Sequence, residues 1–204
     1  MTAFILAGGR SSRMGSDKAL LSFGGQTLLE RALQTAAAVA ERIAIVGPRE
    51  RYARFGEVIE DAYADCGPLA GIHAALGATT TDLNLMLSVD MPLMTASFLG
   101  WLLQTAKAAE ELIVVPDALG GLQPLCAVYR RQVRGIAEQA LQKGDYKIGK
   151  LFALMPTRYL SEQEIVANGF STTIFSNVNT RDEFEALPVS EPVTSHPEKG
   201  SEQT

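Results

Sequence analysis

Short apolar runs alternate with longer amphipathic stretches along most of the chain. The runs with the length of buried strands are residues 3–6, 43–46, 58–59, 83–89 and 112–115. The stretches whose apolar residues recur at helical spacing are 26–40, 69–78, 95–108, 131–143 and 148–155. A strand followed by a helix, repeated in this way, is typical of a parallel sheet covered by helices on both faces. We therefore predict a single α/β domain, a three-layer sandwich around a mostly parallel sheet.

Two parts of the pattern depart from this rhythm. Gly120-Gly121 and the run 125–129 favour a strand that turns back antiparallel, and residues 173–175 are predicted as a final strand. From Pro188 onward the sequence reads PVSEPVTSHPEKGSEQT, with no large apolar residue beyond valine. Such a segment cannot bury enough apolar surface to fold. The prediction is a folded domain over residues 1–187 and a disordered tail over residues 188–204.

Composition narrows the possible functions. The chain has 204 residues and a formal net charge of −5, which argues against a general surface for nucleic acid or for anionic membranes. Two histidines and two cysteines nearly exclude zinc sites, so a catalytic metal is expected to have oxygen ligands, as Mg²⁺ does. No run reaches the roughly 20 apolar residues of a membrane span, and residues 3–7 are too short for a signal peptide. We expect a cytoplasmic protein with reduced thiols at Cys66 and Cys126.

The loop after the first strand is rich in glycine and positive charge. Its glycines are Gly8, Gly9 and Gly15, and its basic residues are Arg10, Arg13 and Lys18, against the single acid Asp17. Glycines let backbone N–H groups approach phosphate oxygens, and ligands of parallel α/β sheets bind beyond the carboxyl ends of the strands. The loop matches neither the Walker A pattern nor GxGxxG. It favours a polyanionic small ligand; a surface turn with solvated basic side chains is the simpler alternative.

Asp90 follows the run 83–89, again at the carboxyl end of a predicted strand. A carboxylate at this edge can hold Mg²⁺ against the phosphate of a ligand. An aspartate close before a proline, here Pro92, is also a common turn former, and the residues alone leave both roles open. His73 lies early on a predicted helix, where an ordinary hydrogen-bonded histidine is favoured over a general base.

These residues carry a family resemblance. The segment from Leu6 to Leu21, LAGGRSSRMGSDKALL, resembles the signature LAGGxSxRMGxDKxLL of the molybdenum cofactor guanylyltransferases, nucleotidyltransferases built on a Rossmann-like sheet. Further matches occur in the same order: GPLAGI at 67–72, DMP at 90–92, QPLCAVY at 123–129 and NVNT at 177–180. Together they span residues 6 to about 187, essentially the whole predicted domain.

The resemblance implies a role for each matching residue. Lys18 and Arg13 would act on the phosphates and the departing pyrophosphate, and Asp90 would bind Mg²⁺. The residues implied to bind the nucleotide are Leu6, Ala7, Gly8, Gly9, Lys18, Asp61, Asp90 and Asn179. Asn177 and Asn179 resemble a pair of asparagines near the family's site, with a plain Asx turn as the alternative.

The implied reaction is the transfer of GMP from GTP to molybdenum-bound molybdopterin, which releases pyrophosphate and forms the guanine dinucleotide cofactor. GTP and molybdopterin would be the small-molecule partners, and molybdoenzyme apoproteins or their chaperones are candidate protein partners. The acceptor is already an anionic phosphate, so no strong general base is required. Positioning, Mg²⁺ and cationic side chains can supply the catalysis.

Alternatives and departures accompany this interpretation. A molybdopterin cytidylyltransferase typically has LAAG and DQP where this chain has LAGG and DMP, and another nucleotidyltransferase with a small phosphorylated acceptor is a more distant alternative. A GTP-binding switch is disfavoured because the chain lacks a Walker A loop and an NKxD motif. Arg181 replaces the proline expected after NVNT, and Gly47-Pro48 stands where many family members have an asparagine.

Overall fold

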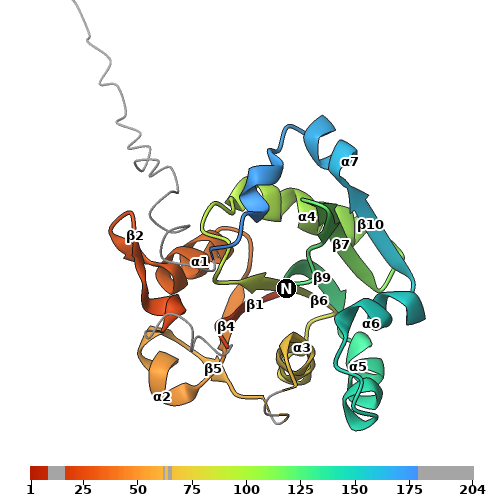
Figure 1. The fold of residues 1–204 in the computed structure, drawn as a ribbon, viewed down its shortest axis with the longest axis horizontal. Coiled ribbons are helices and arrows are strands. Elements are labelled where there is room, and N and C mark those ends of the chain that lie inside the picture. The colour runs from red at the N-terminus through yellow and green to blue at the C-terminus, as the bar shows by residue number, and fades with distance from the viewer. Residues whose placement is uncertain (9–16, 62, 64–65, 179–204) are drawn as a thin grey trace, which may run out of the picture.

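The structure is a computed structural model that describes residues 1–8, 17–61, 63 and 66–178. An eight-stranded sheet forms its centre, in the order β10-β7-β9-β6-β1-β4-β5, with β8 paired to β7 (Figure 1). The strands are β1 Thr2–Leu6, β4 Arg42–Val46, β5 Val58–Ile59, β6 Leu83–Ser88, β7 Ile113–Ala118, β8 Gly121–Leu122, β9 Cys126–Arg130 and β10 Thr157–Ser161. A small hairpin, β2 Ser22–Phe23 and β3 Gln26–Thr27, stands apart from the sheet.

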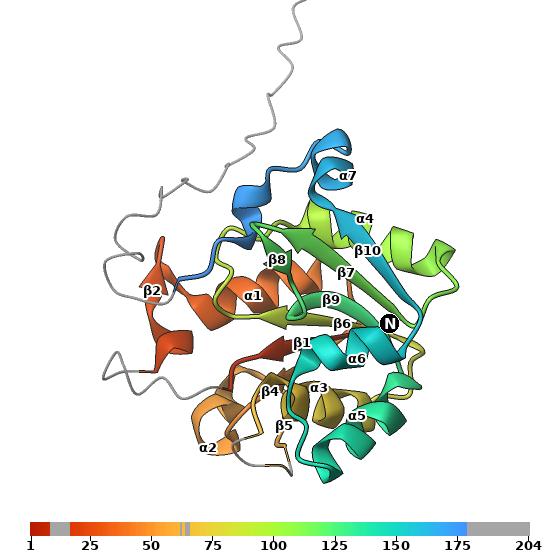
Figure 2. The same ribbon diagram turned by 45° about the vertical axis from the view of Figure 1, so that its right-hand side comes forward.

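Helices cover both faces of this sheet. Successive side chains of β1 show this, because they point alternately into two separate hydrophobic cores. Ala3 and Ile5 pack into one core with α1 Leu28–Ala37 and α4 Ala96–Ala108. Phe4 and Leu6 pack into the other core with α3 Pro68–Gly77, α5 Val133–Gln142 and α6 Ile148–Leu154. Figure 2 shows the sheet between these two groups of helices. The predicted three-layer α/β sandwich is confirmed.

Strand directions follow the prediction as well. β1 pairs in parallel with β4 and β6, β4 with β5, and β7 with β10. β9 runs antiparallel between β6 and β7, which confirms the predicted reversal after Gly120-Gly121. Leu119 and Gly120 make this turn with φ values of 55° and 77°, a region that glycine adopts without strain.

Local capping fixes where the helices begin. Thr27 and Glu30 form a capping box at the start of α1. The hydroxyl oxygen of Thr27 accepts the N–H of Glu30, and the carboxylate of Glu30 accepts the N–H of Thr27. Thr95 accepts the N–H of Phe98 at 3.3 Å and so caps α4. Pro68 occupies the first turn of α3, where its missing N–H costs nothing.

The remaining elements are short. They are α2 Arg49–Tyr52, α7 Glu162–Ala167, and the 3₁₀ helices η2 Lys18–Leu20, η3 Ala53–Phe55 and η4 Thr172–Phe175. The predicted strand at 173–175 is therefore wrong. Ser171 accepts the N–H of Thr173 and starts a helical turn instead, and Ile174 and Phe175 pack into the core from that turn. None of the helices in the described part of the chain is long and apolar enough to cross a membrane.

Candidate active site

β1, β4 and β6 finish side by side at one end of the sheet, here called the carboxyl edge. Leu6 at the end of β1 pairs with Val46 on one side and with Ser88 on the other. The N–H of Ala7 donates to the carbonyl of Val46 at 3.0 Å, which extends this alignment past the strand. The beginning of the predicted phosphate loop and the segment that carries Asp90 are thereby brought to the same edge.

A cavity of about 580 Å³ opens at the carboxyl edge, a size typical of small-molecule sites. Its walls come from the ends of β1, β4 and β5, from the start of α3, and from Ser88 and Leu125. Three of the predicted nucleotide-binding residues line it: Leu6, Gly8 and Asp61. Ala7 lies between the first two and is buried. The structure thus places these residues of separate segments around one space.

Lys18 and Asp90 meet although they are 72 positions apart. The Nζ atom of Lys18 lies 3.4 Å from Oδ2 of Asp90, and the two side chains are 14% and 23% exposed. Asp90 itself is held by its backbone, because its carbonyl accepts the N–H of buried Val178 at 3.0 Å. Charge-assisted N–H···O bonds are usually about 2.7–2.9 Å long. The Lys18–Asp90 contact is therefore longer than an ideal charge-assisted bond, and Asp90 lies two positions after Ser88, which lines the cavity.

The loop after β6 is fixed by a contact from α1. Arg31 donates from Nε to the carbonyl of Pro92, and its guanidinium also stands 5.3 Å from the ring centre of Phe23. Met91 is buried next to Asp90. The backbone around the carboxylate is thus anchored from both sides, which favours a fixed direction for Asp90.

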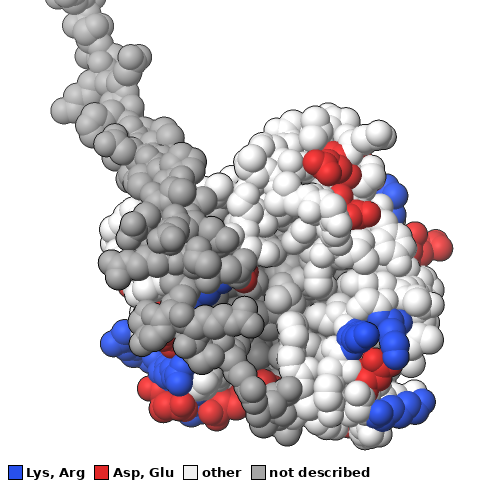
Figure 3. Space-filling view, viewed as in Figure 1, with Lys and Arg blue, Asp and Glu red and all other residues white. Residues whose placement is uncertain are grey.

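Carboxylates gather on the opposite side of the cavity. Glu50, Glu60 and Asp61 line it, and Glu60 accepts the N–H of Arg49 at 3.2 Å. Ionised carboxylates only accept hydrogen bonds, so this wall suits a ligand that presents N–H or O–H donors. Figure 3 shows that acidic and basic side chains are interspersed on the face viewed in Figure 1.

Other predicted site residues lie outside the described part of the chain. These are Gly9, Arg13 and Asn179, together with Arg10 and Gly15 of the same loop. Their roles stay predictions. Asn177, the partner of Asn179 in the motif, is described and exposed, directly before the Val178 that bonds to Asp90. The motif NVNT therefore starts beside the loop of Asp90.

The donor set suits a metal that is shared with a ligand. The described residues contain no group of three or more His, Cys, Asp or Glu side chains able to hold an ion between them. Asp90 offers carboxylate oxygens beside Lys18, and Glu50, Glu60 and Asp61 offer others in the lining of the cavity. Mg²⁺ commonly binds through one or two carboxylates together with substrate phosphates and water, so Asp90 fits this kind of site and not an all-protein cage.

Two other reactive side chains, Cys126 and His73, are buried. Both cysteines are free thiols, as predicted; Cys126 is fully buried, and its burial raises the pKa of the thiol. Burial and the nearby Arg134 lower the pKa of His73, which contacts the ring of Tyr63 edge-on at 5.4 Å. His73 is buried, as expected of a structural residue, but its Nε2 atom has no hydrogen-bond partner among the described residues, so the hydrogen bond expected of it is not found at that atom.

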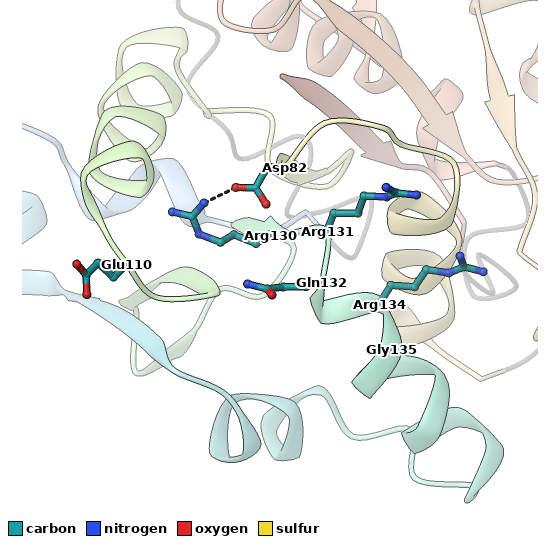
Figure 4. Close-up of a pocket in the computed structure, with 7 residues that line it drawn as sticks. All are labelled: Asp82, Glu110, Arg130, Arg131, Gln132, Arg134 and Gly135. Atoms are coloured by element: carbon teal, nitrogen blue, oxygen red, sulfur yellow. Dashed lines mark hydrogen bonds and ion pairs between the residues drawn. The ribbon is translucent and has the colours of Figure 1, made fainter.

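A second hollow of about 610 Å³ lies at the opposite end of the sheet, and we call it the amino-end hollow. It is lined by Asp82, Glu110, Arg130, Arg131, Gln132, Arg134 and Gly135 (Figure 4). Arg130 forms an ion pair with Asp82, while Arg131 and Arg134 extend away from that pair. No motif of the sequence analysis contributes a predicted site residue to this hollow.

Sequence reasoning missed several residues of the carboxyl edge. Tyr52, Glu50 and Glu60 belong to a charged stretch after β4 that has no motif. Tyr52 is nevertheless almost completely buried and hydrogen-bonded to both Ala7 and Asp17. One signal for it exists: a large aromatic residue five positions after Gly47, within an otherwise polar stretch that follows a buried strand.

Comparisons with known proteins point the same way. A family model described as the MobA-like NTP transferase domain matches residues 3–161. A protein of Flavobacterium johnsoniae named "Probable molybdenum cofactor guanylyltransferase" is 33% identical over 93% of this chain and 97% of its own length. A "Molybdenum cofactor guanylyltransferase" of Syntrophotalea carbinolica is 31% identical over 90% of this chain and 89% of its own.

A solved structure extends this similarity to the fold. The molybdopterin-guanine dinucleotide biosynthesis protein A of Archaeoglobus fulgidus superposes with a TM-score of 0.79 at 25% identity. The match covers 91% of this chain and 95% of the other. The similarity therefore includes the sheet, both helical layers and the carboxyl edge.

Proposed function

Because this chain belongs to the MobA-like NTP transferases, and among them to the molybdenum cofactor guanylyltransferases, we propose that it transfers GMP from GTP to molybdopterin that carries molybdenum. The observation that carries the proposal is the Lys18–Asp90 pair beside the cavity of the carboxyl edge. The pair supports the proposal because it brings a cation and a carboxylate that could hold a metal ion to the edge of the sheet where the predicted phosphate loop begins.

In the proposed reaction a terminal phosphate oxygen of molybdopterin attacks the α-phosphorus of GTP. A new P–O bond forms, the bond between the α-phosphorus and the oxygen shared with the β-phosphate breaks, and pyrophosphate leaves. The acceptor oxygen is already anionic, so no protein base has to remove a proton. Lys18 stabilises the charge on the phosphates, and removing such a group from a polar transition state costs about 10²–10³ in rate.

Asp90 is the residue that would hold Mg²⁺. When bound, the ion neutralises phosphate charge and orients the α-phosphate for in-line attack. The backbone contact from Val178 and the anchoring of the following loop by Arg31 keep the Asp90 carboxylate in place for this role. Arg13 at the pyrophosphate, and Gly9 and Asn179 at the nucleotide, belong to the proposal through the motif alone.

The proposed base is guanine, and the lining of the cavity supports it. Guanine presents N–H donors on its ring and its amino group, and the carboxylates of Glu50, Glu60 and Asp61 are acceptors. A site built to accept such bonds discriminates strongly against a base that lacks the donors. Gly8 lines the same cavity without a side chain and leaves room for a purine.

A pyrophosphate-release assay tests the proposal. The purified protein, Mg²⁺ and molybdenum-loaded molybdopterin are mixed with GTP, CTP, ATP or UTP in separate reactions, with a parallel set containing chelator. We expect release that depends on GTP, acceptor and metal. Faster release with CTP would favour the cytidylyltransferase alternative, and GTP binding without release would favour a binding protein. Either result would overturn the proposal.

The proposal extends to the setting of the enzyme. We place it in the cytoplasm, with a folded domain at 1–187 and a disordered tail at 188–204, as the sequence predicts. Molybdoenzyme apoproteins or their chaperones are the protein partners that would receive the product.

A further inference from the structure

Tyr52 connects two segments that flank the predicted phosphate loop. Its ring is 1% exposed at the end of α2. Its hydroxyl oxygen lies 3.0 Å from the carbonyl oxygen of Ala7 and 2.9 Å from each carboxylate oxygen of Asp17. Ala7 immediately precedes Gly8, and Asp17 immediately precedes Lys18. One buried hydroxyl therefore touches both the base-binding end and the phosphate-binding end of the site.

Asp17 relays this contact to Lys18. Its Oδ1 accepts the N–H of Ala19 at 3.1 Å and so caps η2, the helical turn that begins with Lys18. A capping side chain fixes the direction of the first residues of its turn. Lys18 then reaches Asp90 with its Nζ atom. A continuous series of contacts thus runs from Tyr52 through Asp17 and Lys18 to the metal-binding carboxylate.

Gly47 makes the position of Tyr52 possible. A Cβ atom on residue 47 would lie 2.8 Å from Cε2 of Tyr52 and 3.0 Å from Cδ2, distances shorter than carbon atoms adopt. The ring therefore fits against residue 47 because this residue has no side chain.

We propose that Tyr52 is a positioning residue: its hydroxyl shares its one proton between the Asp17 carboxylate and the Ala7 carbonyl and thereby holds Lys18 toward Asp90 and the phosphates. The inference rests on the proposed function of the site. An O–H donated to a carboxylate is a charge-assisted bond, roughly twice as strong as a neutral one. Because the ring is buried, water has little access to replace the lost contact in a phenylalanine variant.

The hydroxyl remains a donor across the neutral range. Burial, and the nearby Asp17 carboxylate after it, raise the pKa of Tyr52. Arg51 also faces this carboxylate, at 3.6 Å from Oδ2, but its side chain is about half exposed. The buried hydroxyl is therefore the better-defined partner of Asp17.

The test is a double-mutant cycle between Tyr52→Phe and Lys18→Ala. We expect Tyr52→Phe to lower kcat about 10- to 100-fold, since a misplacement of about 1 Å in a catalytic group has effects of this order. In the Lys18→Ala background the same change is expected to cost nothing further, because the group it positions is already gone. Gly47→Ala, which displaces the ring and keeps the hydroxyl, should reproduce the loss.

Thr79→Val is the matched control. It also removes one buried hydroxyl without a change of shape, but at the opposite end of the sheet, where Thr79 bonds to Thr81 and Thr2. We expect a comparable change in Tm for both variants and a loss of kcat only for Tyr52→Phe. Equal losses of kcat for Tyr52→Phe in both backgrounds, or kcat within twofold of the parent, would overturn the positioning role.

The same double-mutant cycle is measured with the Kd for Mg²⁺-GTP, determined by calorimetry, because binding does not depend on turnover. Tyr52→Phe should raise Kd about 2- to 10-fold in the parent and leave Kd unchanged in Lys18→Ala. If the parent releases no pyrophosphate from GTP, the proposed function fails while this binding cycle still decides the role of Tyr52. If the parent is active and the cycle is additive, the positioning role alone fails.

Discussion

The two ends of the sheet each place a cation against an aspartate, and the two pairs differ in what surrounds them. In the amino-end hollow, Arg130 pairs with Asp82 and also donates to the carbonyls of Ala109 and Glu111 at 2.8 and 3.1 Å. At the carboxyl edge, Lys18 and Asp90 lie 3.4 Å apart, and Asp90 follows Ser88, which lines the cavity, by two positions. Arg130 joins the end of α4 to the start of β7, whereas Lys18 is a compact charge beside a binding space.

The neighbouring polar groups follow the same division. At the amino end, buried Asn84 donates to the carbonyls of Thr81 and Asp82 at 3.1 and 2.9 Å, so its amide closes a turn of the backbone. At the carboxyl edge, Glu50 and Asp61 turn toward a cavity. An ion pair beside a hollow therefore does not identify a site, because both ends of the sheet have one. What distinguishes the carboxyl edge is that its cavity is lined by the predicted residues Leu6, Gly8 and Asp61, whereas no predicted site residue lines the amino-end hollow.

The strongest test of this difference is the same isosteric change at each end. Asp90→Asn should lower kcat at least about 100-fold. The substitution removes the negative charge that is proposed to hold the metal and that attracts Lys18. Asp82→Asn should leave kcat unchanged and lower the free energy of unfolding by less than about 1 kcal/mol, because Asp82 is 60% exposed. Steady-state pyrophosphate release and urea unfolding measure the two effects.

Lys18→Ala accompanies this pair and should lose at least about 100-fold in kcat as well. Near-normal turnover in Asp90→Asn or Lys18→Ala would contradict the assigned roles. A large loss of kcat in Asp82→Asn would mean that the amino end contributes to catalysis and would remove the distinction between the two pairs.

Most of the fold was predictable because buried strands have a strong apolar signal. β1, β4 and β6 are flanked by helices on both faces, so nearly all their side chains are apolar. β10 was missed because only Leu160 of its five residues is buried and the strand lies at the edge of the sheet. Residues 173–175 were mistaken for a strand because threonine, isoleucine and phenylalanine favour strands, while the cap from Ser171 acts only in the folded chain.

The residues of the site likewise divide into those that the sequence predicted and those that it did not. Lys18 and Asp90 were predicted separately, from a motif and from a strand end, and the parallel pairing of β1 with β6 brings their segments together. Tyr52 was not predicted because its role depends on contacts across 35 and 45 positions, and on the missing side chain of Gly47. Such a dependence on distant neighbours leaves no local pattern in the sequence.

A smaller effect is expected from adding one methyl group to the wall of the cavity at the carboxyl edge and one to the wall of the amino-end hollow. In Gly8→Ala the new Cβ would meet the carbonyl oxygen of Val46 at 3.8 Å and Cα of Gly47 at 3.9 Å, which are ordinary contacts, so the fold should tolerate it. The methyl narrows the wall of the cavity, and one methyl changes specificity by about 10- to 200-fold. We expect kcat/KM for GTP to fall about tenfold and the ratio of GTP to CTP to fall with it.

Gly135→Ala is the counterpart in the amino-end hollow, where a Cβ meets nothing within 4 Å. It should leave kcat/KM unchanged and raise the free energy of unfolding by up to about 1 kcal/mol, because alanine favours the helix. Equal effects of the two methyl groups on the ratio of GTP to CTP would show that Gly8 does not line the base site.

The smallest effect concerns His73 and separates stability from catalysis within the carboxyl edge itself. His73 follows Gly71, a cavity residue, by two positions, and its Nε2 atom is buried without a hydrogen-bond partner among the described residues. Burial, and after it the positive charge of Arg134, lower the pKa of His73, against the opposing effect of Glu138. The folded protein therefore resists protonation more than the unfolded chain, whose histidine titrates near about 6.5.

It follows that the unfolded chain binds more protons as the pH falls below that value, so the free energy of unfolding should fall with it. His73→Leu removes this contribution, and its stability should decrease less than that of the parent between pH 7 and pH 5, measured by urea unfolding. Its kcat at pH 7 should equal that of the parent. An identical acid loss in both proteins would assign the effect to other groups, and a loss of kcat would extend the catalytic region from the strand ends into α3.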